Sequence, residues 1–207
     1  MNNAERIAAA IDHHLTEKSE IVVFGSAALM LDRRYAEYMP TRVTHDVDII
    51  IPNERELKMD SDRSFWHAID AANKELEPEG LYVTHIFPER EVTLTPEWQQ
   101  HAVRLENPAL NNLTIIRPRI LDLIISKMGR GDTQDLEDVR TLMQLEQKVT
   151  AQTIRLDDVR AAAERARVPA VYQEIFPAAR NRVIATVEEV ERAQMTRDSA
   201  QPKMRIE

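Results

Sequence analysis

The chain has 207 residues, enough for one compact domain or for one domain with a helical extension. Its net charge of −8 argues against a general nucleic-acid binder, whose surface is basic, but is compatible with a local basic groove. Because cysteine is absent and no apolar run reaches the roughly 20 residues of a membrane span, we exclude disulfides and thiolate metal sites and expect a cytoplasmic protein without membrane contact.

The first half of the chain combines helical and strand-like patterns. Apolar residues at helical spacing predict three helices, over residues 4–17, 26–38 and 62–77. Pro40 and Thr41 should end the second of these, and Phe65 and Trp66 should face the core from the third. Apolar, β-branched runs predict strands over residues 20–25, 46–52 and 81–87, and weaker strands over residues 91–94, 102–106 and 113–118.

After Pro118 the pattern is helical almost throughout. It predicts helices over residues 118–128, 133–147, 156–167 and 171–195. Pro177 should kink the last of them. We therefore predict an α/β (α+β) fold. A small mixed β-sheet flanked by helices occupies residues 1–117, and a C-terminal helical region, residues 118–207, packs on it.

Two acidic residues interrupt the predicted strand in the stretch Thr-His-Asp-Val-Asp-Ile-Ile, residues 44–50. Asp46 and Asp48 are two residues apart, so on a strand their carboxylates project from the same face. Like charges at that spacing raise each other's pKa unless a positive group lies between them. A divalent cation with hard oxygen ligands, Mg²⁺ or Mn²⁺, would satisfy the pair. The alternative is a polar strand end that caps a neighbouring helix.

A possible phosphate-binding turn precedes these acids in the chain. The run Ile-Val-Val-Phe leads into Gly25 and Ser26, where a helix is predicted to begin. Glycine lets the backbone approach a ligand closely, and free amides at the start of a helix favour an anion. A strand, Gly-Ser at the start of a helix, and a second strand carrying Asp-x-Asp together suit a nucleoside triphosphate bound through Mg²⁺. Gly-Ser alone is also found at ordinary strand-to-helix turns.

These motifs resemble the nucleotidyltransferase superfamily that is typified by DNA polymerase β, with its Gly-Ser followed by Asp-x-Asp. The run Arg42-Val-Thr44-His-Asp46-Val-Asp48 is similar to the AbiEii/AbiGii toxin branch of that superfamily. That branch also has a lysine-bearing helix followed, after a short gap, by an Asp-x-x-Asp helix. Here Ile-Leu-Asp-Leu-Ile-Ile-Ser-Lys-Met-Gly-Arg-Gly-Asp-Thr-Gln-Asp-Leu-Glu-Asp matches it. The resemblance implies a nucleotidyltransferase core and covers residues 20–145.

The resemblance also assigns roles to individual residues. Asp46 and Asp48 would bind the metal, and Gly25 and Ser26 would hold the triphosphate. It adds three residues from the second half of the chain: Lys127, Arg130 and Asp135. Lys127 and Arg130 would neutralise phosphate charge, and Asp135 would orient Lys127 or lie near the attacking hydroxyl.

The function implied is metal-dependent transfer of a nucleoside monophosphate from an NTP to an acceptor. Members of this branch are toxins of toxin–antitoxin or phage-defence systems, so an RNA or tRNA acceptor and a cognate antitoxin are the expected partners. Many superfamily members place a third carboxylate on a later strand. The predicted strands over residues 81–87 and 113–118 carry none, Glu91 and Glu106 in the weaker strands are poor candidates, and His85 stands alone on the strand over residues 81–87. Two alternatives therefore stay open: a catalytically weak, nucleotide-binding regulatory protein, and a small-molecule nucleotidyltransferase of the antibiotic-modifying type.

Overall fold

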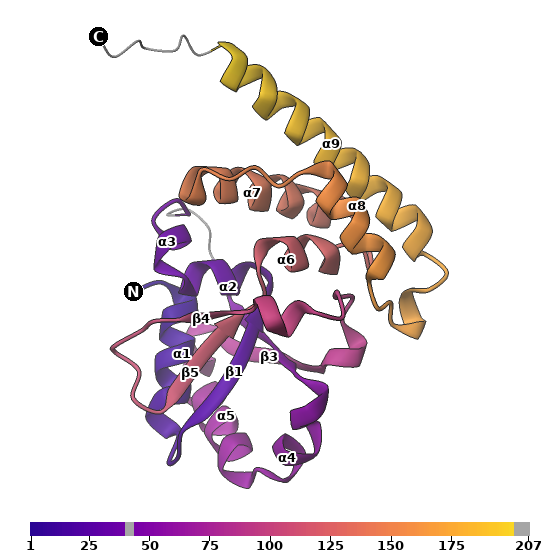
Figure 1. The fold of residues 1–207 in the computed structure, drawn as a ribbon. Coiled ribbons are helices and arrows are strands. Elements are labelled where there is room, and N and C mark those ends of the chain that lie inside the picture. Colours follow the sequence, from indigo (N-terminus) through magenta and orange to yellow (C-terminus); the bar gives the residue numbers. More distant parts are fainter. Residues whose placement is uncertain (40–43, 201–207) are drawn as a thin grey trace, which may run out of the picture. The chain divides into compact units, whose positions relative to one another are not determined.

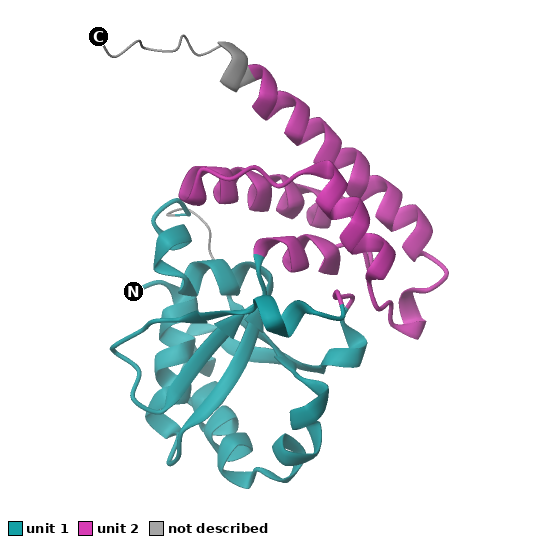
Figure 2. Ribbon diagram, viewed as in Figure 1, with its two compact units in different colours: residues 1–92, 96–119 teal, residues 93–95, 120–207 magenta. Residues whose placement is uncertain are grey.

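The computed structural model describes residues 1–39 and 44–200, so Arg42 and the predicted helix stop at Pro40 and Thr41 lie outside the described residues. The chain divides into two compact units (Figure 2). Unit 1 comprises residues 1–92 and 96–119, and unit 2 comprises residues 93–95 and 120–207. Within the described part of the chain, none of the helices has the length and apolarity needed to span a membrane.

Unit 1 is built on a five-stranded mixed sheet with the strand order β3-β2-β1-β5-β4 (Figure 1). The central strand β1 pairs antiparallel with β2 and parallel with β5, while β2 and β3 are parallel and β4 and β5 antiparallel. The strands are β1 (Ser19–Phe24), β2 (Asp46–Ile51), β3 (Tyr82–Pro88), β4 (Val103–Leu105) and β5 (Leu113–Arg117). The predicted mixed sheet flanked by helices is confirmed.

Two helices, α1 (Asn3–His14) and α5 (Arg63–Leu76), pack against each other and cover one face of this sheet. The helix α1 begins with a capping box, in which Asn2 and Glu5 each bond the other's backbone amide. Alternate strand residues facing these helices are apolar and buried: Ile21, Val23, Val47, Ile49 and Ile115. The opposite face of the two central strands also buries apolar residues, among them Val22 and Ile50.

The predicted helix over residues 26–38 is two helices, α2 (Gly25–Leu31) and α3 (Arg33–Ala36). They are separated at Asp32, which takes an extended conformation and accepts a hydrogen bond from the Arg34 amide as the N-cap of α3. The cause is a buried ion pair, since the same carboxylate also binds Arg117. A partner 85 residues away therefore decides the break.

The prediction for Trp66 is wrong. Its indole is half-buried and donates a hydrogen bond to the carbonyl of Met59, at 2.7 Å, in the short helix α4 (Glu56–Ser61). The buried face of α5 is instead formed by Phe65, Ala68, Ile69, Ala72 and Leu76. Trp66 therefore connects α5 to α4 on the flank of unit 1 rather than contributing to the central core.

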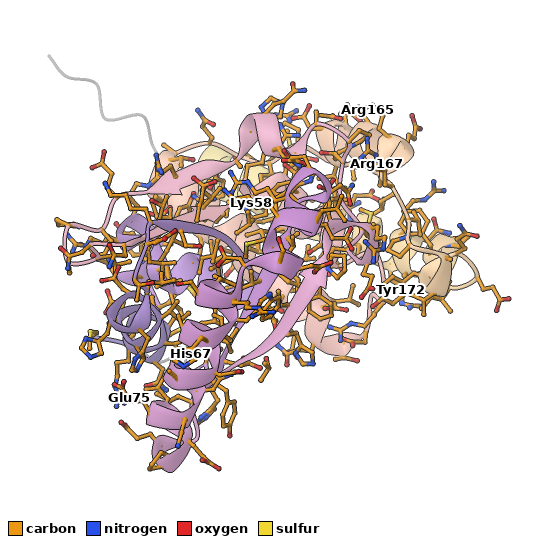
Figure 3. All side chains as sticks on the ribbon, turned by 90° about the horizontal axis from the view of Figure 1, so that it is seen from below. Lys58, His67, Glu75, Arg165, Arg167 and Tyr172 are labelled. Atoms are coloured by element: carbon orange, nitrogen blue, oxygen red, sulfur yellow. The ribbon has the colours of Figure 1, made fainter. Side chains whose placement is uncertain are left out.

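The predicted strand over residues 91–94 is also wrong. Glu89–Glu91 form a 3-10 turn, and Leu94 makes only an isolated bridge with Arg167, whose amide donates to the Leu94 carbonyl at 2.8 Å (Arg167 is labelled in Figure 3). Prolines at positions 88 and 96 flank this segment and cannot donate to a strand ladder. Residues 93–95 consequently belong to unit 2.

Unit 2 is helical. Its helices are α6 (Ile120–Ser126), α7 (Thr133–Thr150), α8 (Leu156–Arg165) and α9 (Phe176–Ala200). The long helix α9 packs on α7 and α8 through a stripe of small and β-branched residues that includes Ala179, Val183 and Val187. Pro177 lies in the first turn of α9, where its missing N–H breaks no helical hydrogen bond, so the expectation of a kink there is wrong.

One buried carboxylate, that of Asp12, ties α1 to the start of β5. Its oxygens accept backbone N–H bonds from Asn111, Asn112 and Leu113 at 3.0, 2.7 and 2.7 Å. These amides lie in the turn before β5 and at its first residue, outside any helix. If the carboxylate were removed, they would lose their acceptor. Asp12 therefore fixes the loop from which β5 enters the sheet.

We expect Asp12→Ala to lower the free energy of unfolding by about 2–3 kcal/mol, because three donors lose a charged acceptor in a largely buried position. Chemical denaturation followed by circular dichroism measures this change. Asp70→Ala on the exposed surface of α5 is the matched control and should change stability by less than about 0.5 kcal/mol. Equal effects of the two substitutions would contradict the role given to Asp12.

The ion pair of Asp32 and Arg117 gives the fold a dependence on pH. Burial raises the pKa of the Asp32 carboxyl, but hydrogen bonds and charge from Arg34 and Arg117 outweigh burial, so that the pKa lies below its ordinary value of 3.8. An acid with a lowered folded-state pKa stabilises the fold above its unfolded pKa. That stabilisation is lost as the pH falls through the lowered value.

Arg117→Met should lower the free energy of unfolding at pH 7 by about 3 kcal/mol, because it leaves a buried carboxylate with weaker compensation. The variant should also begin to unfold at a higher pH than the wild type when it is titrated with acid and followed by circular dichroism. Arg63→Met, which alters an exposed arginine of α5, serves as the control. An unchanged acid midpoint in Arg117→Met would show that the pair does not control acid stability.

Candidate active site

The two acids of β2 lie side by side on the sheet face opposite to α1 and α5. Asp46 and Asp48 alternate with Val47 and Ile49, which are buried on the helix-covered side. The hydroxyl of Thr84 on β3 is 3.4 Å from both Asp46 Oδ2 and Asp48 Oδ1. One hydroxyl proton can serve only one acceptor at a time, so Thr84 lies between the carboxylates without neutralising them.

A β-bulge in β3 adds a second polar side chain to this pair. Val47 is paired with Val83, but the next residue, Asp48, is paired with His85, so that Thr84 is an extra residue in the ladder. His85 Nδ1 lies 3.3 Å from Asp48 Oδ1. The expectation that His85 stands alone is wrong. The break in alternation at Thr84-His85, two polar residues in succession within an apolar strand, is the signal that identifies the bulge.

The pKa of Asp48 is raised above its ordinary value of 3.8. Burial is the largest cause, and the neighbouring charge of Asp46 adds to it, while His85 and Thr84 offset only part of the increase. The groups around Asp48 therefore do not fully offset its burial and the charge of Asp46. A cation bound from solution would supply the remainder.

The Gly25-Ser26 turn lies directly beside Asp48. β1 ends at Phe24, which is paired with Asp48 across the β1–β2 ladder. Gly25 follows with a φ of +68°, and a Cβ placed there would stand 3.8 Å from Asp48 Oδ2. Glycine is favoured by this left-handed conformation rather than by lack of space. The chain thus turns into α2 with its backbone next to the carboxylate pair.

The donor set around β2 fits a magnesium or manganese ion that is bound together with phosphate. Asp46 and Asp48 offer carboxylate oxygens, the ligands that Mg²⁺ prefers. Among the described residues no group of three or more His, Cys, Asp or Glu side chains could hold a metal on its own. Mg²⁺ in nucleotide sites commonly takes one or two carboxylates and completes its shell with phosphate oxygens and water. Two carboxylates beside a glycine turn match that pattern.

Unit 2 brings together the other predicted residues, Lys127, Arg130 and Asp135. Lys127 Nζ lies 3.1 Å from Asp135 Oδ1 and 2.6 Å from Asp138 Oδ2, and Arg130 Nη2 lies 3.1 Å from the same Asp135 oxygen. Asp132 adds a third carboxylate as the N-cap of α7. The Lys127 side chain is 16% exposed, and its ammonium is held by Asp135 and Asp138. The Arg130 side chain is more accessible, at 61% exposure.

Asp135 is the most buried member of this cluster, at 1% exposure. Its Oδ1 contacts both Lys127 and Arg130, whereas its Oδ2 is buried and has no hydrogen-bond partner among the described residues. The hydrogen bond to Asp135 is the main cause that raises the pKa of the Arg130 guanidinium, which stays charged. Asp135 and Asp138 thus both contact the Lys127 ammonium.

The sequence profile of a protein family described as nucleotidyltransferase of unknown function (DUF6036) matches residues 4–164. The matched segment includes β1, β2 and the cluster around Lys127, and it ends before α9. Searches of curated proteins and of solved structures gave no significant match.

Asp48→Asn should raise the melting temperature of the metal-free protein at neutral pH. An acid whose folded-state pKa is raised destabilises the fold as the pH rises above its unfolded pKa, and asparagine removes that cost. Differential scanning fluorimetry in EDTA between pH 4 and 8 measures the difference, which should vanish toward pH 4. Asp70→Asn on α5 is the control and should leave the melting temperature unchanged at all these values. A lower melting temperature for Asp48→Asn at pH 7 would show that the carboxylate is structural.

Proposed function

The chain belongs to this family of nucleotidyltransferases, and we propose that it transfers a nucleoside monophosphate from an NTP to an acceptor in a reaction that requires Mg²⁺ or Mn²⁺. The observation that carries the proposed metal dependence is that the Gly25 turn lies beside Asp48, whose carboxylate shares one strand face with that of Asp46 and has a raised pKa. A triphosphate bound through a divalent cation requires a turn that can hold phosphate next to carboxylates that can bind the cation.

In the proposed reaction an acceptor hydroxyl oxygen attacks the α-phosphorus of the NTP. A new bond forms between that oxygen and phosphorus, the bond to the bridging oxygen of the β-phosphate breaks, and pyrophosphate leaves while the hydroxyl proton is released. Asp46 and Asp48 hold the divalent cation, which when bound supplies positive charge for the attacking and leaving oxygens. Gly25 and Ser26 bind the triphosphate through backbone amides and the serine hydroxyl.

We propose phosphate neutralisation as the role of Lys127 and Arg130. Arg130 is largely exposed and presents a guanidinium fork that suits phosphate. Lys127 is held by two carboxylates, so a phosphate must compete with Asp138 for it. Asp135 keeps the lysine oriented through one oxygen, while its second oxygen is buried and has no hydrogen-bond partner among the described residues.

We propose RNA, with tRNA as the first candidate, as the acceptor, and a toxin of the AbiEii kind, controlled by an antitoxin, as the biological role. The support for both is the resemblance of the Asp46/Asp48 and Lys127/Asp135 motifs to that branch. The net charge of −8 gives no support to RNA binding over the whole surface, so recognition would be local.

One observation favours a second candidate, a protein that binds a triphosphate without turnover. In the described part of unit 1, a histidine and a threonine of β3, rather than a third carboxylate, reach the acid pair. A site with two carboxylates can bind Mg²⁺ with a nucleotide and yet position the catalytic charge weakly. Such a protein would regulate a partner through its nucleotide-bound state.

The test is to incubate the protein with Mg²⁺ or Mn²⁺, each α-³²P-labelled NTP in turn, and total RNA. Transfer should appear as a labelled RNA band, and Asp46→Asn/Asp48→Asn should reduce it by at least about 100-fold, because a catalytic metal contributes several kcal/mol. Lys127→Met should reduce it by about 100- to 1000-fold, the usual effect of losing one group that stabilises developing charge.

Three results would change the proposal. Binding of a triphosphate that depends on Mg²⁺, without label in any RNA, would favour the regulatory candidate. Release of pyrophosphate only when small hydroxylated metabolites or antibiotics replace RNA would favour a small-molecule acceptor. Transfer that persists in the double asparagine variant would mean that Asp46 and Asp48 do not carry the reaction.

A further inference from the structure

The turn between α6 and α7, residues 127–132, is held by a side chain of α9. Arg182 Nε donates to the carbonyl of Gly131 at 2.8 Å, and Arg182 Nη2 donates to the carbonyl of Arg130 at 3.1 Å. One guanidinium thus satisfies two successive backbone acceptors, which a lysine ammonium cannot do with the same planar geometry. Arg182 therefore bridges α9 to the backbone that carries Lys127 and Arg130.

The helix backbone itself also touches the turn. Gly131 has a φ of +58°, and a Cβ added there would lie 2.9 Å from both Cα and Cβ of Ala179, which is fully buried on α9. Only glycine allows so close an approach in this conformation. At the other side of the turn, a Cβ on Gly129 would lie 3.2 Å from Thr93 Oγ1 and from the ring of Tyr172, which is labelled in Figure 3.

From these contacts we infer that Arg182 is a positioning residue, which fixes the Lys127–Asp132 turn and thereby the orientation of the cations that receive the triphosphate. The inference rests on the proposed function. It goes beyond the matched family segment, which ends at residue 164, whereas α9 begins at Phe176. Arg130 carries one of the two carbonyls that Arg182 holds, and the Gly131 amide donates to the Lys127 carbonyl at 2.9 Å. Asp132 caps the helix that presents Asp135.

The clamp can be tested without any enzyme activity. The amides of Met128 and Gly129 donate to carbonyls at the end of α6, and the Gly131 amide donates to the Lys127 carbonyl. Hydrogen exchange of these three amides should become about tenfold faster in Arg182→Met, since two hydrogen bonds to the turn are lost. Arg182→Lys, which keeps the charge, should give an intermediate rate. Arg192→Met on α9 removes an exposed arginine that pairs with Glu188 one turn away and should change none of these amides. Unchanged exchange in Arg182→Met overturns the clamp.

A double-mutant cycle tests positioning in the reaction. Arg182→Met should slow nucleotidyl transfer by about 10- to 100-fold, because a small displacement of catalytic groups has an effect of that size. In a Lys127→Met background the same substitution should cost little more, since the group it positions is gone. Multiplicative losses would overturn positioning and assign Arg182 an independent role, such as its own phosphate contact. Arg182→Lys should recover part of the lost rate.

The two proposals fail in different ways. If the wild type transfers no nucleotide but binds a non-hydrolysable NTP, the proposed transfer reaction is wrong. The same double-mutant cycle is then measured on the affinity for that NTP. In that case non-additive losses support positioning and additive losses overturn it. If the wild type binds no triphosphate at all, positioning is overturned even where exchange confirms the clamp, because the turn then presents its cations to no ligand.

Discussion

The repulsion between Asp46 and Asp48 is the constraint around which the face of β2 that bears them is organised. Strand geometry places both carboxylates on one side of β2. Val47 and Ile49 alternate with them and are buried on the other side, which faces α1 and α5. The bulge in β3 then directs Thr84 and His85 toward the acids, yet the pKa of Asp48 still lies above its ordinary value. The fold tolerates this electrostatic repulsion because the apolar residues of β2 that pack toward α1 and α5 stabilise the strand independently of the acids.

Other buried carboxylates of the chain have more hydrogen-bond donors and positive charge around them than Asp46 and Asp48 have. Asp12 receives three backbone amides, Asp32 binds the guanidinium of Arg117, and Asp135 contacts Lys127 and Arg130. Each of these carboxylates has donors that the protein itself provides. Asp46 and Asp48 share the weak contact of the Thr84 hydroxyl, and in addition Asp46 lies 3.1 Å from the Thr44 hydroxyl and Asp48 lies beside one histidine. A pair left short of positive charge, beside a glycine turn, is what a cation-binding function requires.

The sequence was sufficient to predict the elements whose patterns are local. The alternation of Val47 and Ile49 with the acids gave the strand and its faces, and helical spacing gave α7 and α8 close to their observed limits. The break at Asp32 could not be predicted, because it depends on Arg117 in a distant strand. The successive polar residues Thr84 and His85 mark a break in the alternation of β3, but the bulge itself depends on the register of two parallel strands. The same holds for His85, whose contact with Asp48 follows from that register.

The assignment of Thr93–Thr95 to unit 2 has a similar origin. The segment is too short to form a strand of its own, but Leu94 pairs with Arg167 and the Thr95 hydroxyl donates to the buried Asp122 carboxylate at 2.6 Å. Contacts with α6 and with the residues after α8 therefore decide where these three residues lie. A linear division of the chain near residue 118 cannot represent a unit that takes a segment from earlier in the sequence.

A motif marks the residues that carry chemistry but not the residues that hold them in place. The Lys127–Asp132 turn illustrates the difference. Its glycines are required by the backbone conformation and by close contacts with α9 and Tyr172. Gly131 reads from the sequence as a simple break between helices, although Ala179 leaves no room for a side chain at that position. The contacts that hold the turn after Lys127 therefore extend past the segment that the family profile matches, since this turn is bounded by a helix that begins at Phe176.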